Sequence, residues 1–367
     1  MDKTIVRKVN QYLRKKRPII SSQVICDTYQ NNTFLEIAFI SKGCRNDLKG
    51  SCIMCDYGVT HGSKSKEVYL NEMKSILEKA QNVQYLLLCA NGSIMDEYQL
   101  SEEIFKSILE NVATTEIPNI IIETHFRDIN IEKLEYIKKL LPGKNITIEL
   151  GLETANQIYQ DSLIMKEIIM DEIEKKIKEI QQLGISVDLN IMLGLPFLSE
   201  KEQLKDALET VNWTIKHNCN PVVFPLNIKP YTLLYHMYQT GYYRPVSLWL
   251  VILLLSLLEP MDLQRVTISY YGNRTDEYLG IEEETIYPYT CPKCYQRVMD
   301  FFESFFHENK WQERYNLTKE VLSWNGCNCL ADQQNLLVKK NTTTFDDLYT
   351  DYINTLKKDF SFLFSEE

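Results

Sequence analysis

The feature that most constrains the fold is a series of six apolar segments that alternate with stretches of helical spacing. The apolar segments lie at residues 34–40, 84–89, 118–123, 146–150, 185–193 and 221–228. Helical periodicity covers residues 67–80, 101–112, 131–141, 161–183 and 199–216 between them. Near-continuous apolar strands that alternate with helices are typical of a parallel sheet whose two faces are both covered. The pattern therefore predicts a chain of β/α units.

Six such units fall short of the eight that close a full barrel. We therefore predict an α/β fold, a partial (β/α)6 barrel of the TIM type that spans residues 31–245 and is open on one side. A basic N-terminal segment, residues 1–30, precedes it. Residues 246–367 are predicted to form a small, Cys-rich helical extension, with an amphipathic tail at 345–364.

Charge and composition indicate which partners the protein can bind and in which cellular compartment it works. A formal net charge of -10 argues against unaided, high-affinity binding of a long nucleic acid. The first 17 residues are polar and basic, without the apolar core of a signal peptide, and the longest apolar run, 248–258, is too short to span a membrane. We expect a cytoplasmic protein without membrane contact, whose ten cysteines serve metal or thiol chemistry rather than disulfides.

Three cysteines follow the first predicted strand in the pattern C-x7-C-x2-C. They are Cys44, Cys52 and Cys55, and the loop between them is rich in Gly, Asn, Asp and Lys, so it can bend back and bring the thiols together. Three thiolates can hold a 4Fe-4S cluster and leave one iron open, whereas structural zinc takes four ligands. Zinc is the alternative at this loop if a residue such as His61 supplies the fourth ligand.

Polar residues follow the later strands at their carboxyl ends, where barrel active sites are assembled. These candidates are Asn91, Gly92, Ser93, Glu123, Arg127, Glu153 and Asn190. The turn at 91–93 offers backbone carbonyls and a hydroxyl to an ammonium group, and Arg127 offers a partner to a carboxylate. Glu153 and Asn190 could bind ribose hydroxyls. Structural explanations also exist, such as an ordinary turn at 91–93 and an ion pair between Glu123 and Arg127.

Taken together, these motifs resemble the radical S-adenosylmethionine (radical SAM) superfamily. The usual first spacing of that superfamily is C-x3-C, and the C-x7-C of this chain points to a branch with an enlarged cluster loop. Within such branches, segments 91–96, 123–127, 149–154 and 193–197 resemble the radical SAM (beta) subunit of archaeosine synthase, and more distantly the catalytic subunit of Elongator.

The resemblance implies that the three loop cysteines hold a 4Fe-4S cluster whose open iron binds S-adenosylmethionine (SAM). It implies that an electron from a flavodoxin or ferredoxin cleaves SAM reductively, and that the resulting 5'-deoxyadenosyl radical takes a hydrogen atom from the substrate. Met54 and Tyr57 would lie against the adenine, and the turn at 91–93 would meet the methionine amine.

Four further cysteines form two tight pairs near the C-terminus. The pairs are Cys291 with Cys294 and Cys327 with Cys329, and two predicted helices, at 295–310 and 312–324, separate them. Two short spacings suit one tetrahedral metal ion, so zinc is the preferred occupant. A second 4Fe-4S cluster is the alternative.

The sequence narrows the substrate without identifying it. The acidic balance favours a peptide or a specialised metabolite, with or without presentation by a partner protein, that undergoes rearrangement, fragmentation or bond formation. The archaeosine likeness suggests the alternative, a transfer RNA with a lysine-bearing deazaguanine. A zinc-bound scaffold without enzymatic activity is the second alternative. Tyr231, His236 and Tyr243 are candidates for the substrate side, unless they are aromatic core residues.

Overall fold

The computed structural model describes residues 3–17, 24–29, 33–58, 64–269 and 285–364, and its centre is one sheet of eight strands. The strands are neighbours in chain order: β1 (Val24–Tyr29), β2 (Phe34–Phe39), β3 (Tyr85–Ala90), β4 (Asn119–Thr124), β5 (Asn145–Glu153), β6 (Ser186–Leu193), β7 (Asn220–Pro225) and β8 (Thr267–Ile268). Strands β2 to β8 are parallel, and β1 is antiparallel to β2. The six predicted strands are β2 to β7, so the partial (β/α)6 barrel is confirmed, and β1 is an addition that the sequence pattern did not indicate.

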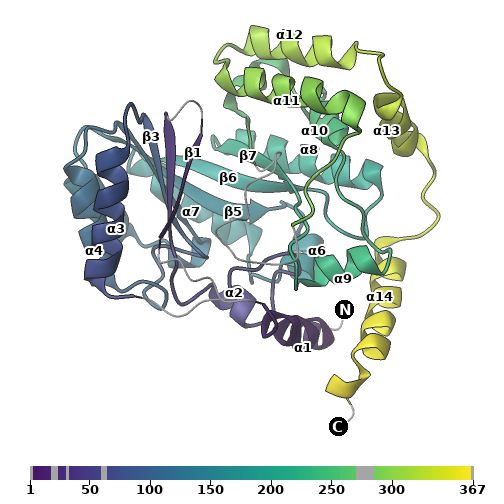
Figure 1. Ribbon diagram of the computed structural model, residues 1–367, viewed down its shortest axis with the longest axis horizontal. Helices are drawn as coiled ribbons and strands as arrows, with labels where there is room; N and C mark the ends of the chain where they lie inside the picture. The colour runs from purple at the N-terminus through teal and green to yellow at the C-terminus, as the bar shows by residue number, and fades with distance from the viewer. Residues whose placement is uncertain (1–2, 18–23, 30–32, 59–63, 270–284, 365–367) are drawn as a thin grey trace.

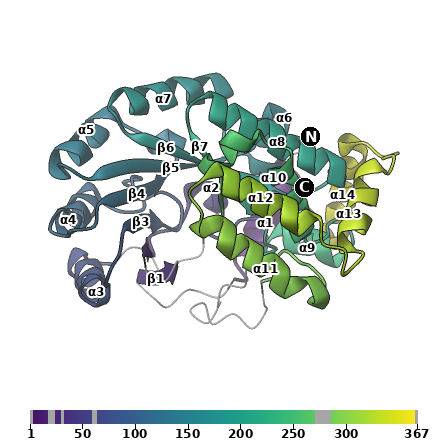
Figure 2. The same ribbon diagram turned by 90° about the horizontal axis from the view of Figure 1, so that it is seen from above.

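Helices between the parallel strands cover the convex side of the sheet, which curls into an open half-barrel (Figures 1 and 2). These helices are α3 (Lys66–Lys79), α4 (Glu102–Ala113), α5 (Ile131–Leu140), α7 (Met170–Gln182) and α8 (Glu200–Lys216). Two short helices, α2 (Arg45–Leu48) and α6 (Gln157–Tyr159), lie in loops after β2 and β5. Ser199 and Glu202 form the capping box that begins α8, with both reciprocal bonds present.

The two faces of the sheet differ more than the sequence pattern suggests. On β5, Ile146, Ile148 and Leu150 are buried against the helices, whereas Glu149 between them is only half-buried. Strand β6 repeats this alternation, and Asp188 lies on the half-buried face. The expectation that both faces are covered therefore holds less well on the concave side of β5 and β6, where the described residues are half-buried. That concave side is called the inner face below.

The helix predicted over residues 161–183 is confirmed only over its larger, C-terminal part, which is α7. A π-helical turn, Gln160–Ile164, follows α6, and Met165 and Glu167 then take the left-handed conformation, with φ of 54° and 60°. The Gln160 amide donates to the carbonyls of Leu152 and Thr154, which ties this turn to the end of β5. Because of this break, Lys166 is not part of a helix, and its side chain contacts Glu153 at the end of β5.

The C-terminal helices pack on the half-barrel. Their buried residues form one hydrophobic core with residues of β6, β7 and α8. They are α9 (Leu233–Gln239), α10 (Leu248–Ser256), α11 (Pro292–His307), α12 (Trp311–Leu322), α13 (Cys329–Val338) and α14 (Phe345–Asp359). The Cys-rich helical extension is confirmed, although α9 and α13 are helices that the sequence did not reveal. The boundary at residue 246 remains a prediction.

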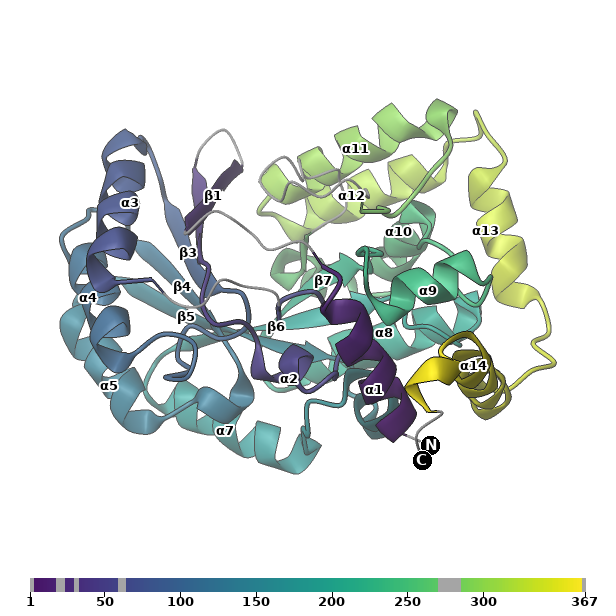
Figure 3. The same ribbon diagram turned by 60° about the horizontal axis from the view of Figure 1, so that its bottom comes forward.

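The N-terminal helix α1 (Lys3–Arg14) lies beside the cysteine loop and against α14, so the first and last helices of the chain are neighbours (Figure 3). The Tyr12 ring lies 6.0 Å from the Phe360 ring and 5.1 Å from the Phe362 ring, measured between centroids. Val6 and Val9 are buried beneath the helix, as its spacing predicts. None of the helices in the described part of the chain combines the length and the apolar character needed to span a membrane.

Candidate active site

The cysteine loop begins where β2 ends and folds back on itself. Cys44 donates its N–H to the Tyr57 carbonyl at 2.9 Å, and Cys55 donates to the Cys52 carbonyl at 3.0 Å. Cys52 has a positive φ of 57° and donates its N–H to the Ile164 carbonyl at 3.0 Å. Burial raises the pKa of the Cys55 thiol well above its usual value, and the Cys52 and Cys44 sulfurs are near enough to add to that rise. These backbone bonds fold the loop back on itself, so that Cys44 is held at Tyr57 and Cys55 is held at Cys52.

The turn after β3 packs directly on this loop. A Cβ on Gly92 would come within 2.8 Å of Cys44 Cβ, and the φ of Gly92 is 141°, so glycine is required here. The Asn91 Oδ1 accepts bonds from the Ser41 N–H at 2.7 Å and the Ser41 hydroxyl at 2.8 Å, and its Nδ2 donates to the Tyr57 carbonyl at 3.1 Å. The Asn91 side chain thus fixes the loop. Because its polar atoms are already bonded, the backbone of the turn is the part that could contact a ligand.

The ends of β3 and β4 are joined through Ser93. Its Oγ lies 2.8 Å from the Thr124 hydroxyl and accepts the His125 N–H at 3.2 Å. Burial lowers the pKa of His125 well below its usual value, so the ring is neutral, and Nδ1 accepts the Arg127 N–H at 3.1 Å. His125 is a buried polar residue of the site that sequence reasoning did not select, because nothing in its neighbourhood distinguishes it from a core histidine.

Arg127 lies at the surface rather than in the half-barrel. Its Nε is 3.0 Å from Asp128, and its Nη2 is 3.6 Å from Asp96. The predicted structural alternative, an ion pair between Arg127 and Glu123, is wrong because Asp128 is the next residue in the same turn, whereas Glu123 lies on the inner face. The pairing of Arg127 with a ligand carboxylate remains a prediction and would have to compete with Asp128.

Glu153 and Asn190, the predicted ribose ligands, both belong to the inner face. Glu153 ends β5 with a φ of 69°, and its Oε1 is bound by Lys166 Nζ. Its Oε2 is buried and has no hydrogen-bond partner. Asn190 lies beside Gly151 in the strand register and hydrogen-bonds the Glu149 carboxylate.

The predicted adenine contacts and substrate-side aromatics have mixed surroundings. Met54 is buried in the hydrophobic core, whereas the Tyr57 side chain is exposed. His236 bonds the Tyr352 hydroxyl at 2.9 Å, and the buried Tyr243 hydroxyl donates to the Gly194 carbonyl at 2.7 Å. These contacts favour the alternative that His236 and Tyr243 are core residues.

Comparison with known proteins gives a family match for the central part of the chain. Residues 39–211, from the end of β2 to α8, match the family described as the radical SAM superfamily. The chain carries a radical SAM domain. Radical SAM enzymes use a 4Fe-4S cluster and SAM, and residues 39–211 are similar to this superfamily.

Relatives of this radical SAM protein include two archaeosine synthase beta subunits. The one from Methanosarcina acetivorans is 25% identical over 223 residues, which cover 59% of this chain and 64% of that protein. The one from Thermococcus kodakarensis is 28% identical over 228 residues, covering 59% and 69%. The matched region thus spans about two thirds of each relative. Among solved structures, Methanocaldococcus infernus Elp3 aligns with a TM-score of 0.44 and 14% identity over 65% of this chain and 58% of that chain.

The matched region contains the three cysteines that the superfamily resemblance implies as cluster ligands. Cys52 is buried and Cys55 is half-buried, and burial raises both thiol pKa values, so iron binding would have to displace their protons. Among the described residues, the three loop cysteines do not form a group with ligand atoms as close together as a single metal ion requires. His61, the fourth ligand in the zinc alternative, lies outside the described residues.

A buried arginine holds this loop from the N-terminal side. Arg17 follows α1 and donates from Nη1 to Asp47 Oδ2 at 2.7 Å, from Nη2 to the Cys55 carbonyl at 2.9 Å and from Nε to the Tyr231 carbonyl at 3.2 Å. Asp47 also accepts the Gly58 N–H. The side chains of Arg17 and Asp47 are 4% and 0% exposed. The sequence marks this N-terminal segment only as polar and basic, and nothing in it indicates that Arg17 is buried.

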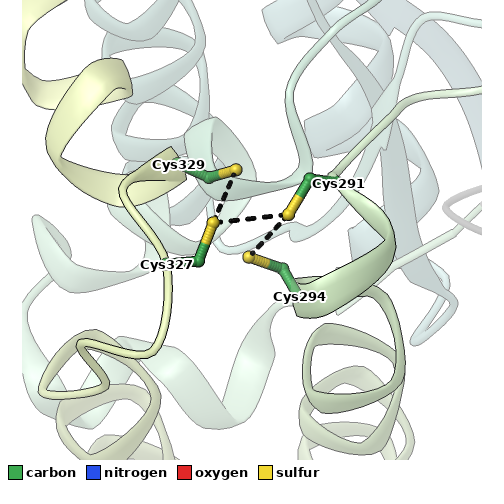
Figure 4. A group of neighbouring side chains, drawn as sticks. All are labelled: Cys291, Cys294, Cys327 and Cys329. Atoms are coloured by element: carbon green, nitrogen blue, oxygen red, sulfur yellow. Dashed lines mark hydrogen bonds between the residues drawn. The ribbon is translucent and has the colours of Figure 1, made fainter.

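The four C-terminal cysteines converge at the start of two helices (Figure 4). Cys291 and Cys294 begin α11, and Cys327 and Cys329 lie at the start of α13. The Cys291 Sγ lies 3.5 Å from the Cys294 Sγ and 3.3 Å from the Cys327 Sγ, and the Cys327 Sγ lies 3.3 Å from the Cys329 Sγ. All four sulfurs fall within 4.8 Å of one another, so this group could hold a metal ion. Four thiolates at such separations suit tetrahedral zinc, with Zn–S bonds of about 2.3 Å.

Proposed function

We propose that Cys44, Cys52 and Cys55 hold the 4Fe-4S cluster and that the enzyme acts on a peptide or a specialised metabolite. One observation supports the cluster assignment. The cysteine loop meets the turn after β3 at the carboxyl end of the half-barrel, where Gly92 packs closely against Cys44. When bound, the cluster and SAM supply a 5'-deoxyadenosyl radical, started by an electron from a flavodoxin or ferredoxin, that takes a hydrogen atom from the substrate.

The protein's own residues would orient the reactants and exclude water. The backbone at 91–93 would meet the methionine amine, because the Asn91 side chain is already committed to Ser41 and Tyr57. Glu153 has a free, buried Oε2 that could accept a ribose hydroxyl, and Asn190 lies opposite Gly151 on the next strand, where it could serve the same ribose. Met54 would contribute an apolar contact to the adenine.

A transfer RNA substrate of the archaeosine type is the second candidate. Two relatives that match over 59% of this chain are beta subunits of archaeosine synthase. Because a subunit belongs to a larger assembly, this also supports a partner protein. The net charge of -10 weighs against a nucleic acid bound by this chain alone. Binding to unmodified bulk tRNA at increasing salt separates the two: a tRNA enzyme should lose affinity steeply, and an enzyme of small molecules should show little binding at any salt.

Cluster formation can be tested without the substrate. The protein is reconstituted anaerobically with iron and sulfide, reduced with dithionite in the presence of SAM, and assayed for 5'-deoxyadenosine. We expect Cys55→Ala to lose both the iron and the product. The matched control is Cys26→Ala, a half-buried cysteine on β1, which should retain both. Absence of iron in the reconstituted wild-type protein, with zinc at both cysteine groups, would favour the scaffold alternative instead.

We also propose zinc at the C-terminal cysteines, as a structural site. The ion would join the start of α11 to the start of α13, and α13 in turn contacts α8 through the bond from Gln333 to Glu200 at 3.0 Å. A metal at this point would fix the extension to the half-barrel.

A further inference from the structure

Helix α1 and the residues directly after it form a strongly basic segment of an acidic protein. Residues 3–17 contain no acidic side chain, whereas the whole chain has a net charge of -10. One basic residue of the segment, Arg17, is buried against Asp47. The other six are half-buried or exposed and are called the basic surface below: Lys3, Arg7, Lys8, Arg14, Lys15 and Lys16.

Contacts within the protein offset only part of this charge. Glu167 Oε1 lies 3.7 Å from Arg7 Nη2, in an ion pair whose side chains are 69% and 33% exposed. Lys16 Nζ lies over the Tyr12 ring, 4.6 Å from its centroid, and this contact leaves the ammonium charged. Lys15 and Lys16 are both exposed. The basic surface therefore presents a net positive charge to solvent.

Helix α1, which carries the basic surface, lies beside the cysteine loop (Figure 3). On the buried side of the helix, Asn10 donates from Nδ2 to the Ser51 carbonyl at 3.2 Å, directly before Cys52. After the helix, Arg17 donates from Nη2 to the Cys55 carbonyl at 2.9 Å. A short hydrogen-bonded path therefore connects the basic surface, through α1, to two of the three predicted cluster ligands.

The proposed reaction needs one electron from outside the chain, and that electron has to reach the loop cysteines. Electron transfer slows steeply as the distance between donor and acceptor grows, so the donor has to dock close to the loop. The turn after β3, which is the predicted contact of SAM, meets the loop at Cys44 through Gly92. Helix α1 meets the loop beside Cys52 and Cys55 instead. A protein docked on α1 would therefore leave the SAM side of the loop uncovered.

We propose that the basic surface of α1 docks an acidic electron-transfer protein, which reduces the cluster. This inference rests on the proposed function, since it assigns the partner surface of that same site. The donor is a reduced flavin or iron-sulfur protein that loses one electron, and the cluster gains that electron without a proton. Opposite charges on the two proteins raise the rate of encounter and orient the partners, which suits a complex that forms and separates at every turnover.

A nucleic acid is the other polyanion that such a surface attracts. Without the seven basic residues of the segment 3–17, the rest of the chain carries a formal charge of -17. A transfer RNA extends well beyond one helix, so most of its phosphates would face this acidic remainder. A small acidic protein can confine its contacts to α1, and the charge distribution therefore favours the electron donor.

Formation of 5'-deoxyadenosine from SAM tests the proposal when two kinds of reductant drive it. The anaerobically reconstituted protein is assayed with dithionite and, separately, with flavodoxin or ferredoxin that NADPH and a reductase keep reduced. Lys15→Glu/Lys16→Glu reverses two exposed charges of the basic surface. At subsaturating donor protein we expect the rate driven by that protein to fall about tenfold or more, the scale of electrostatic steering, while the dithionite-driven rate stays that of the wild type.

The matched control is Lys74→Glu/Lys79→Glu, which reverses two exposed charges on α3 and changes the net charge by the same amount. This variant should keep both rates. In the wild type, added salt should slow the reaction driven by the donor protein, because salt screens the attraction between the two proteins.

The proposal is overturned if the α1 variant keeps the wild-type rate with the donor protein, if it also loses the dithionite-driven rate, if the α3 variant loses as much, or if salt has no effect. Filter binding of bulk tRNA that is lost in the α1 variant would identify a surface for RNA instead. Product with dithionite but with neither donor protein would refute this inference alone, whereas no product with dithionite would refute the proposed function.

Discussion

The buried pair of Arg17 and Asp47 gives the sharpest prediction about how the cysteine loop is held. Arg17→Met keeps the length and apolar stem of the side chain but removes three donors, to Asp47, to the Cys55 carbonyl and to the Tyr231 carbonyl. It leaves the Asp47 carboxylate buried without its cation. Breaking a buried ion pair in this way typically costs about 3–5 kcal/mol.

The loss should depend on pH in a defined direction. Burial is the largest cause that raises the pKa of Asp47, and the Arg17 charge is the largest that opposes it. Without Arg17 the folded protein therefore holds the Asp47 proton to a higher pH than the unfolded chain does. Its stability then falls as pH rises through that interval, so the penalty of Arg17→Met should be larger near pH ~8 than near pH ~5.5.

Urea unfolding of the iron-free protein at the two pH values measures this difference. Lys15→Met, an exposed residue of the same segment, is the matched control and should cost about 0.5 kcal/mol or less. The double variant Arg17→Met/Asp47→Asn should recover much of the loss, because it removes the unpaired charge and leaves an amide oxygen to accept the Gly58 N–H. A loss below about 1 kcal/mol, or one that does not change with pH, would refute the assignment of Arg17 as the residue that holds the loop.

Two further predictions concern stability elsewhere in the chain. Burial raises the pKa of Asp206 from 3.8 to about 7, so the folded state keeps a proton that the unfolded chain loses, and stability falls as pH rises through this window by up to about 4 kcal/mol. Asp206→Asn retains an acceptor for the Thr154 hydroxyl at 2.8 Å and should gain on the wild type between those pH values in urea unfolding; parallel curves would contradict this. Cys327→Ala should abolish bound zinc and lower the melting temperature while iron at the first site is retained. If that variant were instead stable and cleaved SAM without converting substrate, the second cysteine group would have a catalytic role.

Much of the barrel could be predicted because its signals are local. Helix boundaries follow caps such as Ser199 with Glu202, and strand positions follow apolar runs. The helix break at Met165 and Glu167 could not be predicted, since neither Gly nor Pro marks it. Bonds to distant residues impose it, from Cys52 to the Ile164 carbonyl and from Lys166 to Glu153.

The residues of the candidate site also fall into those that the sequence predicts and those that it does not. The cysteines were predictable from spacing alone, since their chemistry requires them to be near in sequence. Arg17 was not, because its partners lie 30, 38 and 214 residues away and a basic residue beside a helix normally faces solvent. Glu149 and Asp188 on the inner face lie between these cases: the alternation of polar and apolar residues around Glu149 is visible in the sequence, but which face is more exposed depends on how the sheet curls.

The contact between α1 and α14 has a consequence for biogenesis. Helix α1 precedes the half-barrel in the chain and α14 follows it, with more than 300 residues between Arg14 and Phe345. On the ribosome, the outer support of α1 is therefore synthesised after every barrel strand. Until synthesis is nearly complete, Tyr12 therefore lacks the rings of Phe360 and Phe362 that lie against it in the finished protein.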